Sequence, residues 1–375
     1  MSEVWRWTPS TISEQLEFAT DVRSSQTIEV RDSMKDATQY LTVNHVVEHA
    51  VAEEMRRLVR ANPLGEWLVP EWPTASIYKT TSALAAATVL PVDDSAAYQV
   101  GQQVFVGTDL AYELAEVAAL GVGEITITSG LVDSYVGTPG DPLAIAPILT
   151  CIAPAGITFA MQYPVTSLSV AFMSIVPVDL AQSSYPEYED LPIMTDARVP
   201  FSPLGGSISQ QNILFDSGFG AYLPIATEDF VRQYDTASFF DSNWADRFER
   251  RRFLHFMRGR DGEAWSMTGI NNLPIVTNGG TSATVEFNGI PADLLGLHVV
   301  FWDGVNYYGR EITGVLDAGE NLALITFATV PDLDTSFCIS FITRIRFDTD
   351  SFDLSYIIST NGLYCSFAVD VIEVP

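Results

Sequence analysis

GQQVFVGTDLAYELAE, residues 101–116, has a counterpart in GLHVVFWDGVNYYGRE, residues 296–311. Both stretches begin with Gly, have Val three residues later and end in Glu, and they lie 195 residues apart. Self-similarity at a fixed spacing is the usual signature of repeated structural units. We therefore expect two tandem copies of one unit, although common β-strand patterns can also align by accident.

Further matches at nearly the same spacing support this interpretation. They are Asp21, Ile28 and Val30 with Asp216, Leu223 and Ile225 at 195, Leu168 and Phe172 with Leu363 and Phe367 at 195, Gly65-Glu66 with Gly262-Glu263 at 197, and Cys151-Ile152 with Cys338-Ile339 at 187. We predict a first unit at residues 1–181, a Pro-containing, acidic linker at 182–200 and a second unit at 201–375. A chain of 375 residues is long for one hydrophobic core and agrees with two domains.

The chain is strongly acidic, because 19 Lys and Arg stand against 47 Asp and Glu, a formal net charge of −28. This charge opposes binding to nucleic-acid phosphates and to anionic membranes, so we expect neither as a partner. No apolar run has the length of a signal peptide's core or a membrane span. Nine basic residues near the ends of two expected helices suggest two basic spots that meet acidic surface on the same chain or on a neighbouring subunit: Arg56, Arg57, Arg60, Arg247, Arg250, Arg251, Arg252, Arg258 and Arg260.

Short runs rich in Val, Ile and Thr, separated by Gly and Pro, favour a mainly β fold in which each unit is a β-barrel or sandwich. Each unit is expected to hold a hairpin (18–30 and 213–225) and one prominent helix (41–60 and 239–258). An N-terminal arm, residues 1–13, carries Trp5 and Trp7 and is expected to pack on its own unit or on a neighbour. The remaining expected extended segments are 67–73, 88–91, 104–106, 114–119, 125–128, 148–152, 165–178, 285–287, 299–301, 311–315, 322–327, 338–342, 352–358 and 365–374.

Few residues form a pattern typical of catalysis. His45, Glu48 and His49 match H-x-x-E-H, which on a helix can bind zinc and supply a base; the alternative is that they are histidines on a helix surface. Cys151, Cys338 and Cys365 are too few for a disulfide framework and are expected as reduced, packed side chains. We predict no catalytic, cofactor or metal site, and no enzyme activity.

Several phrases resemble bacteriophage tail-tip proteins of long-tailed phages and gene transfer agents, encoded after the tape measure. They are FATDV (18–22) with EVR (29–31), WLVPEWP (67–73), FL (253–254) with RGRDGEAW (258–265), ITRIRFDTD (342–350) and the final EVP (373–375). The resemblance implies a structural virion protein, a distal tail or baseplate component that joins the tail tube to the tip as a ring. Implied partners are further copies, as a trimer or hexamer, and the tube and hub proteins. The implied location is the virion tail, assembled in the host cytoplasm.

Two other functions remain open. A β-sandwich with exposed aromatic side chains can bind glycans or a receptor, with Trp72, Trp302, Tyr307 and Tyr308 as the stacking residues. A zinc hydrolase built on His45, Glu48 and His49 is the other.

Overall fold

The computed structural model describes residues 3–24, 29–63, 65–176, 183–195, 206–209, 212–216, 222–226, 232–267, 272–278, 280–319, 321–328, 338–359 and 362–374. Strands take up 55% of the chain and helices 13%, which confirms the predicted mainly β class. The strands form large sheets, and the described residues contain no closed barrel, so the barrel form of the prediction is wrong.

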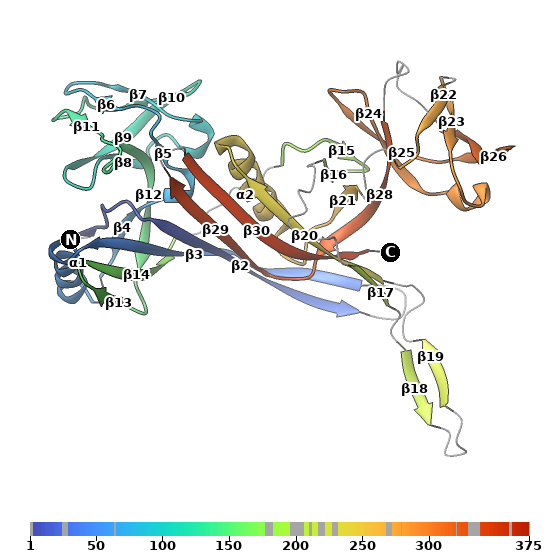
Figure 1. Cartoon of the computed structure of the whole chain (residues 1–375), viewed down its shortest axis with the longest axis horizontal. Helices are drawn as coiled ribbons and strands as arrows, with labels where there is room; N and C mark the ends of the chain where they lie inside the picture. Colours follow the sequence, from blue (N-terminus) through green and yellow to red (C-terminus); the bar gives the residue numbers. More distant parts are fainter. Residues whose placement is uncertain are drawn as a thin grey trace.

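Long strands cross the middle of the molecule as one central sheet (Figure 1). Neighbouring strands in this sheet are antiparallel. Their order is β13 (Ile157–Gln162), β14 (Val165–Ser174), β3 (Glu29–Glu48), β2 (Thr11–Ser24), β29 (Ser351–Ser359), β30 (Gly362–Glu373), β20 (Arg232–Asp241) and β17 (Gly206–Ser209). The first four belong to the first half of the chain and the last four to the second, so the sheet continues across both halves.

Two smaller lobes stand on the same side of this sheet (Figure 1). The first contains β5 (Ser76–Ile77), β6 (Ser82–Ala83), β7 (Val89–Pro91), β8 (Gln103–Gly107), β9 (Tyr112–Gly121), β10 (Glu124–Ile127), β11 (Tyr135–Val136) and the start of β12 (Ala144–Ile152). The second contains β22 (Ile275–Asn278), β23 (Ser282–Glu286), β24 (His298–Trp302), β25 (Tyr307–Glu311), β26 (Gly314–Gly319), β27 (Leu322–Thr326) and the start of β28 (Cys338–Phe347). Each lobe has its own apolar cluster.

The strand pairs follow the same order in the two halves. In the first, β1 (Glu3–Val4) is parallel to β4 (Trp67–Pro70), β4 pairs with β12, β12 with β14 and β8, and β14 with β3 and β13. In the second, β16 (Leu191–Met194) is parallel to β21 (Ala264–Met267), β21 pairs with β28, β28 with β30 and β24, and β30 with β20 and β29. Common descent of the halves remains a prediction.

Both expected helices are shorter than predicted. Residues 41–48 are the end of β3, and α1 covers only His49–Ala61; likewise residues 239–241 end β20, and α2 covers Trp244–Met257. Leu41, Val43 and His45 alternate with more exposed neighbours and pair with β14. Valine spacing in this segment fits both a helix and a strand, and pairing with β2 and β14 decides for the strand.

Other sequence predictions have mixed outcomes. The two hairpins are present as β2–β3 and as β18 (Asn212–Asp216) with β19 (Tyr222–Ala226), and most expected strands are confirmed. The segment 311–315 is interrupted between β25 and β26, and the expected linker contains β15 (Glu187–Tyr188) and β16. Cys151 pairs with Trp67 whereas Cys338 pairs with Trp302, so these cysteines are not at equivalent positions.

One apolar core joins the two halves. It includes Trp5, Trp7 and Leu16 from the first half together with Phe253 and Phe347 from the second. Trp5 and Trp7 are buried within their own chain, so the N-terminal arm does not offer them to a neighbour. The shared core holds the long strands together beneath the lobes. The described residues also include three short 3₁₀ turns: η1 (Trp72–Thr74), η2 (Ser95–Ala97) and η3 (Pro291–Leu294).

Two valine substitutions distinguish the strand from the expected helix. A helix over 41–60 would bury Val43 and Val46 on one face, whereas in β3 Val43 is 0% and Val46 is 58% exposed. Val43→Ala should lower the free energy of unfolding by about 2 kcal/mol, because it leaves a cavity in the core. Val46→Ala should cost less than about 0.5 kcal/mol. Urea unfolding measures both, and equal losses would contradict the strand.

Candidate functional site

The H-x-x-E-H residues do not form a helical zinc site. His45 lies inside β3, Glu48 is its last residue and His49 begins α1, so the two histidines do not share a helix face. Nε1 of Trp5 donates a hydrogen bond to Nε2 of His45 at 3.1 Å. The Nδ1 atom of His49 lies 2.5 Å from the hydroxyl of Thr166. The placement of this motif on one helix is therefore wrong.

His45 is held in its neutral form. Burial lowers its pKa to about 4, and a backbone contact with Thr8 opposes this change only in part. A neutral ring can accept the Trp5 N–H at Nε2, whereas an imidazolium cannot. His45 is thus a packed core residue beside Trp5, whose ring centroid lies 5.8 Å away.

Other side chains of types that can bind metals also have structural roles. Asp350 accepts hydrogen bonds from Thr20 and from the backbone N–H of Arg260. Cys151 and Cys365 are buried free thiols, and burial raises the pKa of each to about 12. Within the described ranges, no group of three His, Cys, Asp or Glu side chains could hold a metal ion.

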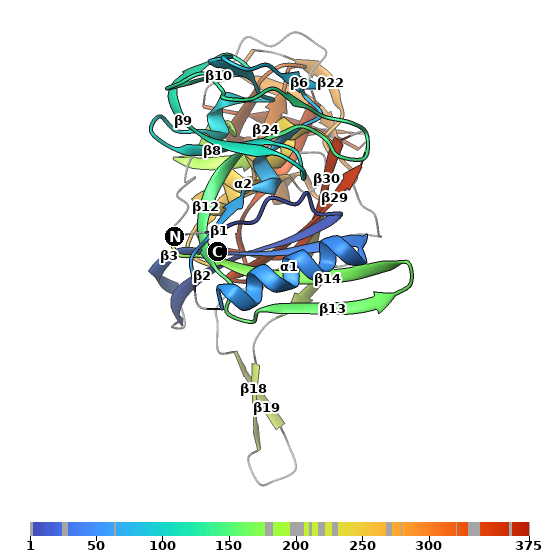
Figure 2. The same ribbon diagram turned by 90° about the vertical axis from the view of Figure 1, so that its left-hand side faces the viewer.

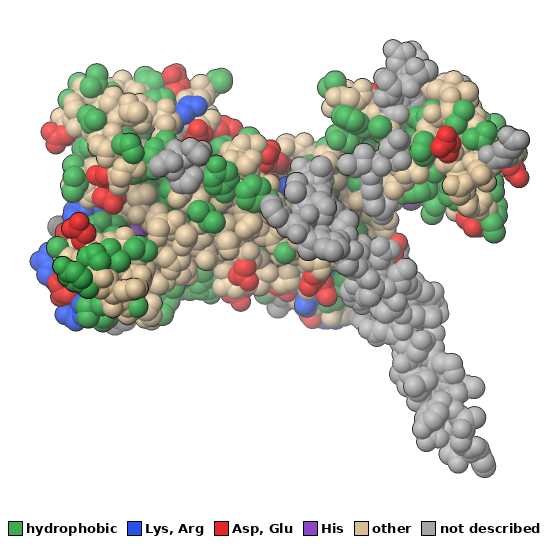
Figure 3. Space-filling view, viewed as in Figure 1, with side chains coloured by type: hydrophobic (Ala, Val, Ile, Leu, Met, Phe, Trp, Pro, Cys, Tyr) green, Lys and Arg blue, Asp and Glu red, His purple; other side chains and the backbone are tan. Residues whose placement is uncertain are grey.

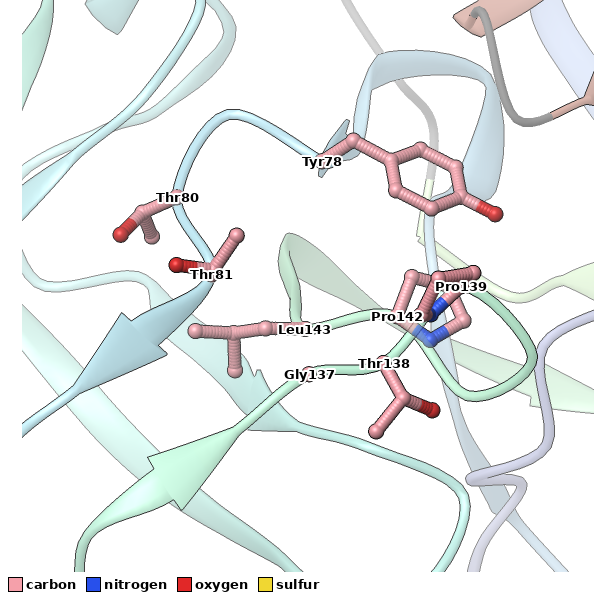
Figure 4. Close-up of a pocket in the computed structure, with 8 residues that line it drawn as sticks. All are labelled: Tyr78, Thr80, Thr81, Gly137, Thr138, Pro139, Pro142 and Leu143. Atoms are coloured by element: carbon pink, nitrogen blue, oxygen red, sulfur yellow. The ribbon is translucent and has the colours of Figure 1, made fainter.

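A small pocket of about 220 Å³ opens in the first lobe between residues 78–81 and 137–143 (Figure 4). Tyr78 lies across from Pro139 and Pro142, and Leu143 forms part of the wall. Its polar side chains are hydroxyls, without a charged or titratable side chain apart from the Tyr78 phenol. Burial raises the pKa of that phenol, so it is a poor base at neutral pH.

The expected glycan-stacking residues divide into two groups. Trp72 is fully buried, so its proposed role is wrong. Trp302 is 38% exposed, and its ring stacks on Tyr307 with the centroids 6.2 Å apart. The hydroxyl of Tyr308 donates a hydrogen bond to Asp303 at 3.2 Å. A stacked pair therefore remains in the second lobe, in which Trp302 is exposed and Tyr307 is half-buried.

The most concentrated chemistry of the molecule is a buried charge network around Arg251 of α2. Its Nη2 atom donates to Glu14 at 2.7 Å and to Glu71 at 2.6 Å, and its Nε donates to Glu14 at 3.0 Å. Tyr356 and Gln39 donate to Glu14 at 2.6 and 2.7 Å. Both oxygens of the Glu14 carboxylate thus accept hydrogen bonds.

Burial and charge act in opposite directions on this network. Burial alone would lower the pKa of the Arg251 guanidinium, but Glu14 and Glu71 together raise it well above its usual value. Burial and the neighbouring Glu14 also raise the pKa of the Tyr356 phenol. The guanidinium therefore stays charged and the phenol stays a hydrogen-bond donor. This chemistry stabilises an arrangement of strands.

The network connects the two halves of the chain. Glu14, Gln39 and Glu71 come from the first half, whereas Arg251 and Tyr356 come from the second. Sequence reasoning missed it, although one signal exists. Glu14 lies between Ile12 and Leu16 on the face of β2 that points into the core, where an apolar residue is expected. A carboxylate at such a position requires a buried partner.

The two expected basic spots differ in how far their arginines are exposed. In the second spot, Arg247, Arg250 and Arg251 of α2 are buried, Arg252 and Arg260 are partly exposed and Arg258 is exposed, so only part of this spot lies at the surface. In α1, Arg57 and Arg60 are exposed, and the Arg56 guanidinium lies 4.1 Å from the ring centre of Phe159 in β13. Figure 2 shows α1 lying along β13 and β14 at one end of the molecule. Figure 3 shows hydrophobic, basic and acidic side chains together at this end.

Removing the Arg251 charge should destabilise the protein strongly. Arg251→Met leaves two buried carboxylates without their cation, a loss of about 3–5 kcal/mol. Arg251→Met combined with Glu14→Gln and Glu71→Gln should recover much of the loss, because the uncompensated charges are gone. Arg60→Met, at an exposed ion pair with Glu53, should cost less than about 1 kcal/mol. Urea unfolding measures all three; equal effects of Arg251→Met and Arg60→Met would contradict the network's role.

His45 should make the fold acid-sensitive. Its pKa is about 4 when folded and 6.5 in an unfolded chain, so the unfolded state binds more protons between these values. Stability should therefore fall as the pH is lowered from about 6.5 to 4, by on the order of 3 kcal/mol. The pH dependence of unfolding should be smaller by this amount in His45→Gln. Identical pH profiles for His45→Gln and the wild type would refute the assignment.

No helix among the described residues is long and apolar enough to cross a membrane. Comparison of the sequence with protein-family models found no match, and comparison with curated proteins found none.

Proposed function

We propose that this chain is a structural component of a bacteriophage tail tip, of the distal tail or baseplate type. In this role it joins the tail tube to the tip by forming a ring with copies of itself and by contacting tube and hub proteins. It acts in the virion tail after assembly in the host cytoplasm. The observation that carries the proposal is the central sheet, which runs without interruption from the first half of the chain into the second.

The junction between the halves is itself an assembly interface within one chain. β2 of the first half pairs with β29 of the second over seven residue pairs, from Thr11↔Ile357 to Glu17↔Ser351. The Arg251 network and the shared apolar core lie at the same junction. A chain that joins two units side by side through strands provides a geometry that further units can extend.

The matching order of strand pairs supports tandem copies of one unit. If each chain contributes two such units, three chains present six similar units around one axis. A tube of sixfold symmetry could then meet a tip of threefold symmetry through this protein. The sequence resemblance to tail-tip proteins and the network of structural rather than reactive polar groups agree with this role.

A second candidate function rests on Trp302 and Tyr307. Their stacked rings in the second lobe could bind the face of a sugar, which would make the chain a glycan-binding module of a tail. The proposal above has more support, because Tyr307 is half-buried and packs against a small apolar cluster, which leaves less of its ring for a sugar.

The location of the chain in a phage particle tests the proposed function. Immunogold labelling or cryo-electron microscopy of particles that contain this protein should place it at the junction of tail tube and tip, as a ring. Deleting its gene should give particles or tubes without a finished tip. Particles with complete tails that lack the protein would contradict the proposal, as would its presence in the head.

A further inference from the structure

The two helices occupy equivalent places but differ in how much of each is covered. α1 follows β3, the strand that pairs with β14 in the first half. α2 follows β20, the strand that pairs with β30 in the second half. In α2, eight of 14 residues are buried, whereas in α1 only Ala52 and Met55 of 13 are buried. The first half of the chain covers α2: Glu14 and Glu71 bind Arg251, and Trp244 donates to the backbone of Thr74 at 3.3 Å.

The strand edges show the same contrast. β2 pairs with both β3 and β29, and β29 pairs with both β2 and β30. The counterpart of β2 in the other half is β17, which pairs with β20. The counterpart of β29 is β13, which pairs with β14. Among the described residues, β17 and β13 each have one paired edge and one free edge. They lie at opposite ends of the central sheet (Figure 1).

The free edge of β13 carries apolar side chains. Phe159 is 45% and Met161 is 65% exposed, and Tyr163 in the turn after β13 is 89% exposed. An unprotected edge strand with exposed apolar side chains is a template for pairing with another chain. Arg56 lies over Phe159, and Arg57 and Arg60 continue the exposed face of α1. We call β13, Tyr163 and these three arginines the β13 surface.

We infer that the β13 surface binds a second copy of this chain through the free edge of that copy's β17. The inference rests on the proposed ring assembly and names the surfaces that form it. The new pair would repeat, between chains, the antiparallel pairing of β2 with β29 inside one chain. The exposed face of α1 would then be covered by the second copy, as α2 is covered by the first half.

Charge and symmetry fit this occupant. A second copy carries a formal net charge of −28, which is opposite in sign to the exposed Arg57 and Arg60 of α1. The two edges are different surfaces, so the contact is head-to-tail. Head-to-tail contacts close into rings when the rotation between copies permits, and otherwise extend into filaments.

Two exposed apolar residues of β13 provide the test. Phe159→Lys with Met161→Lys places charges on the edge, which should raise the dissociation constant of self-association at least about a hundredfold. Leu110→Lys with Val122→Lys is the matched control, since Leu110 and Val122 are exposed apolar residues of the first lobe. Sedimentation of the full-length proteins measures the association, and circular dichroism checks that each variant is folded.

A second variant pair tests the helix face independently. Arg57→Glu with Arg60→Glu should weaken self-association and reverse the effect of added salt on it. Hydrogen exchange should also become slower in β13 of the wild type as protein concentration increases. If both substituted proteins associate as strongly as the wild type, the inference is overturned. It is also overturned if the wild-type protein is a monomer at every concentration. Neither result decides whether the chain lies in the tail, which the particle experiment determines separately.

Discussion

The Arg251 guanidinium compensates two buried carboxylates, and the placement of the two halves of the chain depends on this compensation. Glu14 sits on the long strand β2 and Glu71 follows β4, so both carboxylates belong to the first half. Arg251 comes from α2 in the second half and is almost fully buried. A buried ion pair gives little net stability compared with an apolar core, but a missing partner is very costly. The network therefore selects one alignment of the halves rather than strengthening every alignment.

This selection explains why the central sheet is continuous. Burial of Ile12 and Leu16 in β2 and of Phe352 and Leu354 in β29 fixes which side chains face the core, but a shift of the pairing by two residues would keep that pattern. Tyr356 lies on β29 and donates to Glu14 on β2, so the network spans the two strands at the junction. Phe18 and Phe352, with ring centroids 5.9 Å apart, add apolar contact across it. A displaced register would leave buried charges and aromatic rings without partners.

The sequence predicted the fold class and many strands, because alternation and turn residues are local signals. It misplaced the boundary between β3 and α1, since Val43, Val46 and Val47 satisfy both periods and only pairing with β14 decides. It also read the arginines of α2 as a surface feature. Arg250 pairs with Asp241 only nine residues away, but the burial of Arg251 depends on Glu14 and Glu71, which lie 237 and 180 residues away along the chain. Spacing along one element carries no information about such a partner.

The alternative zinc site on His45, Glu48 and His49 failed for a related reason. His45 and His49 are four residues apart, but a change from strand to helix lies between them. What the chain has instead is an unequal pair of surfaces: α2 is covered by the other half, and α1 and the β13 edge are not. Head-to-tail assembly removes this inequality, because every copy then supplies the cover that its neighbour lacks.

A cryo-electron microscopy map of the purified protein at high concentration tests this account most directly. The account predicts a closed ring in which β13 of each copy lies beside β17 of the next and α1 is covered. A ring whose copies meet through the lobes, or an isolated monomer with α1 uncovered, would contradict it.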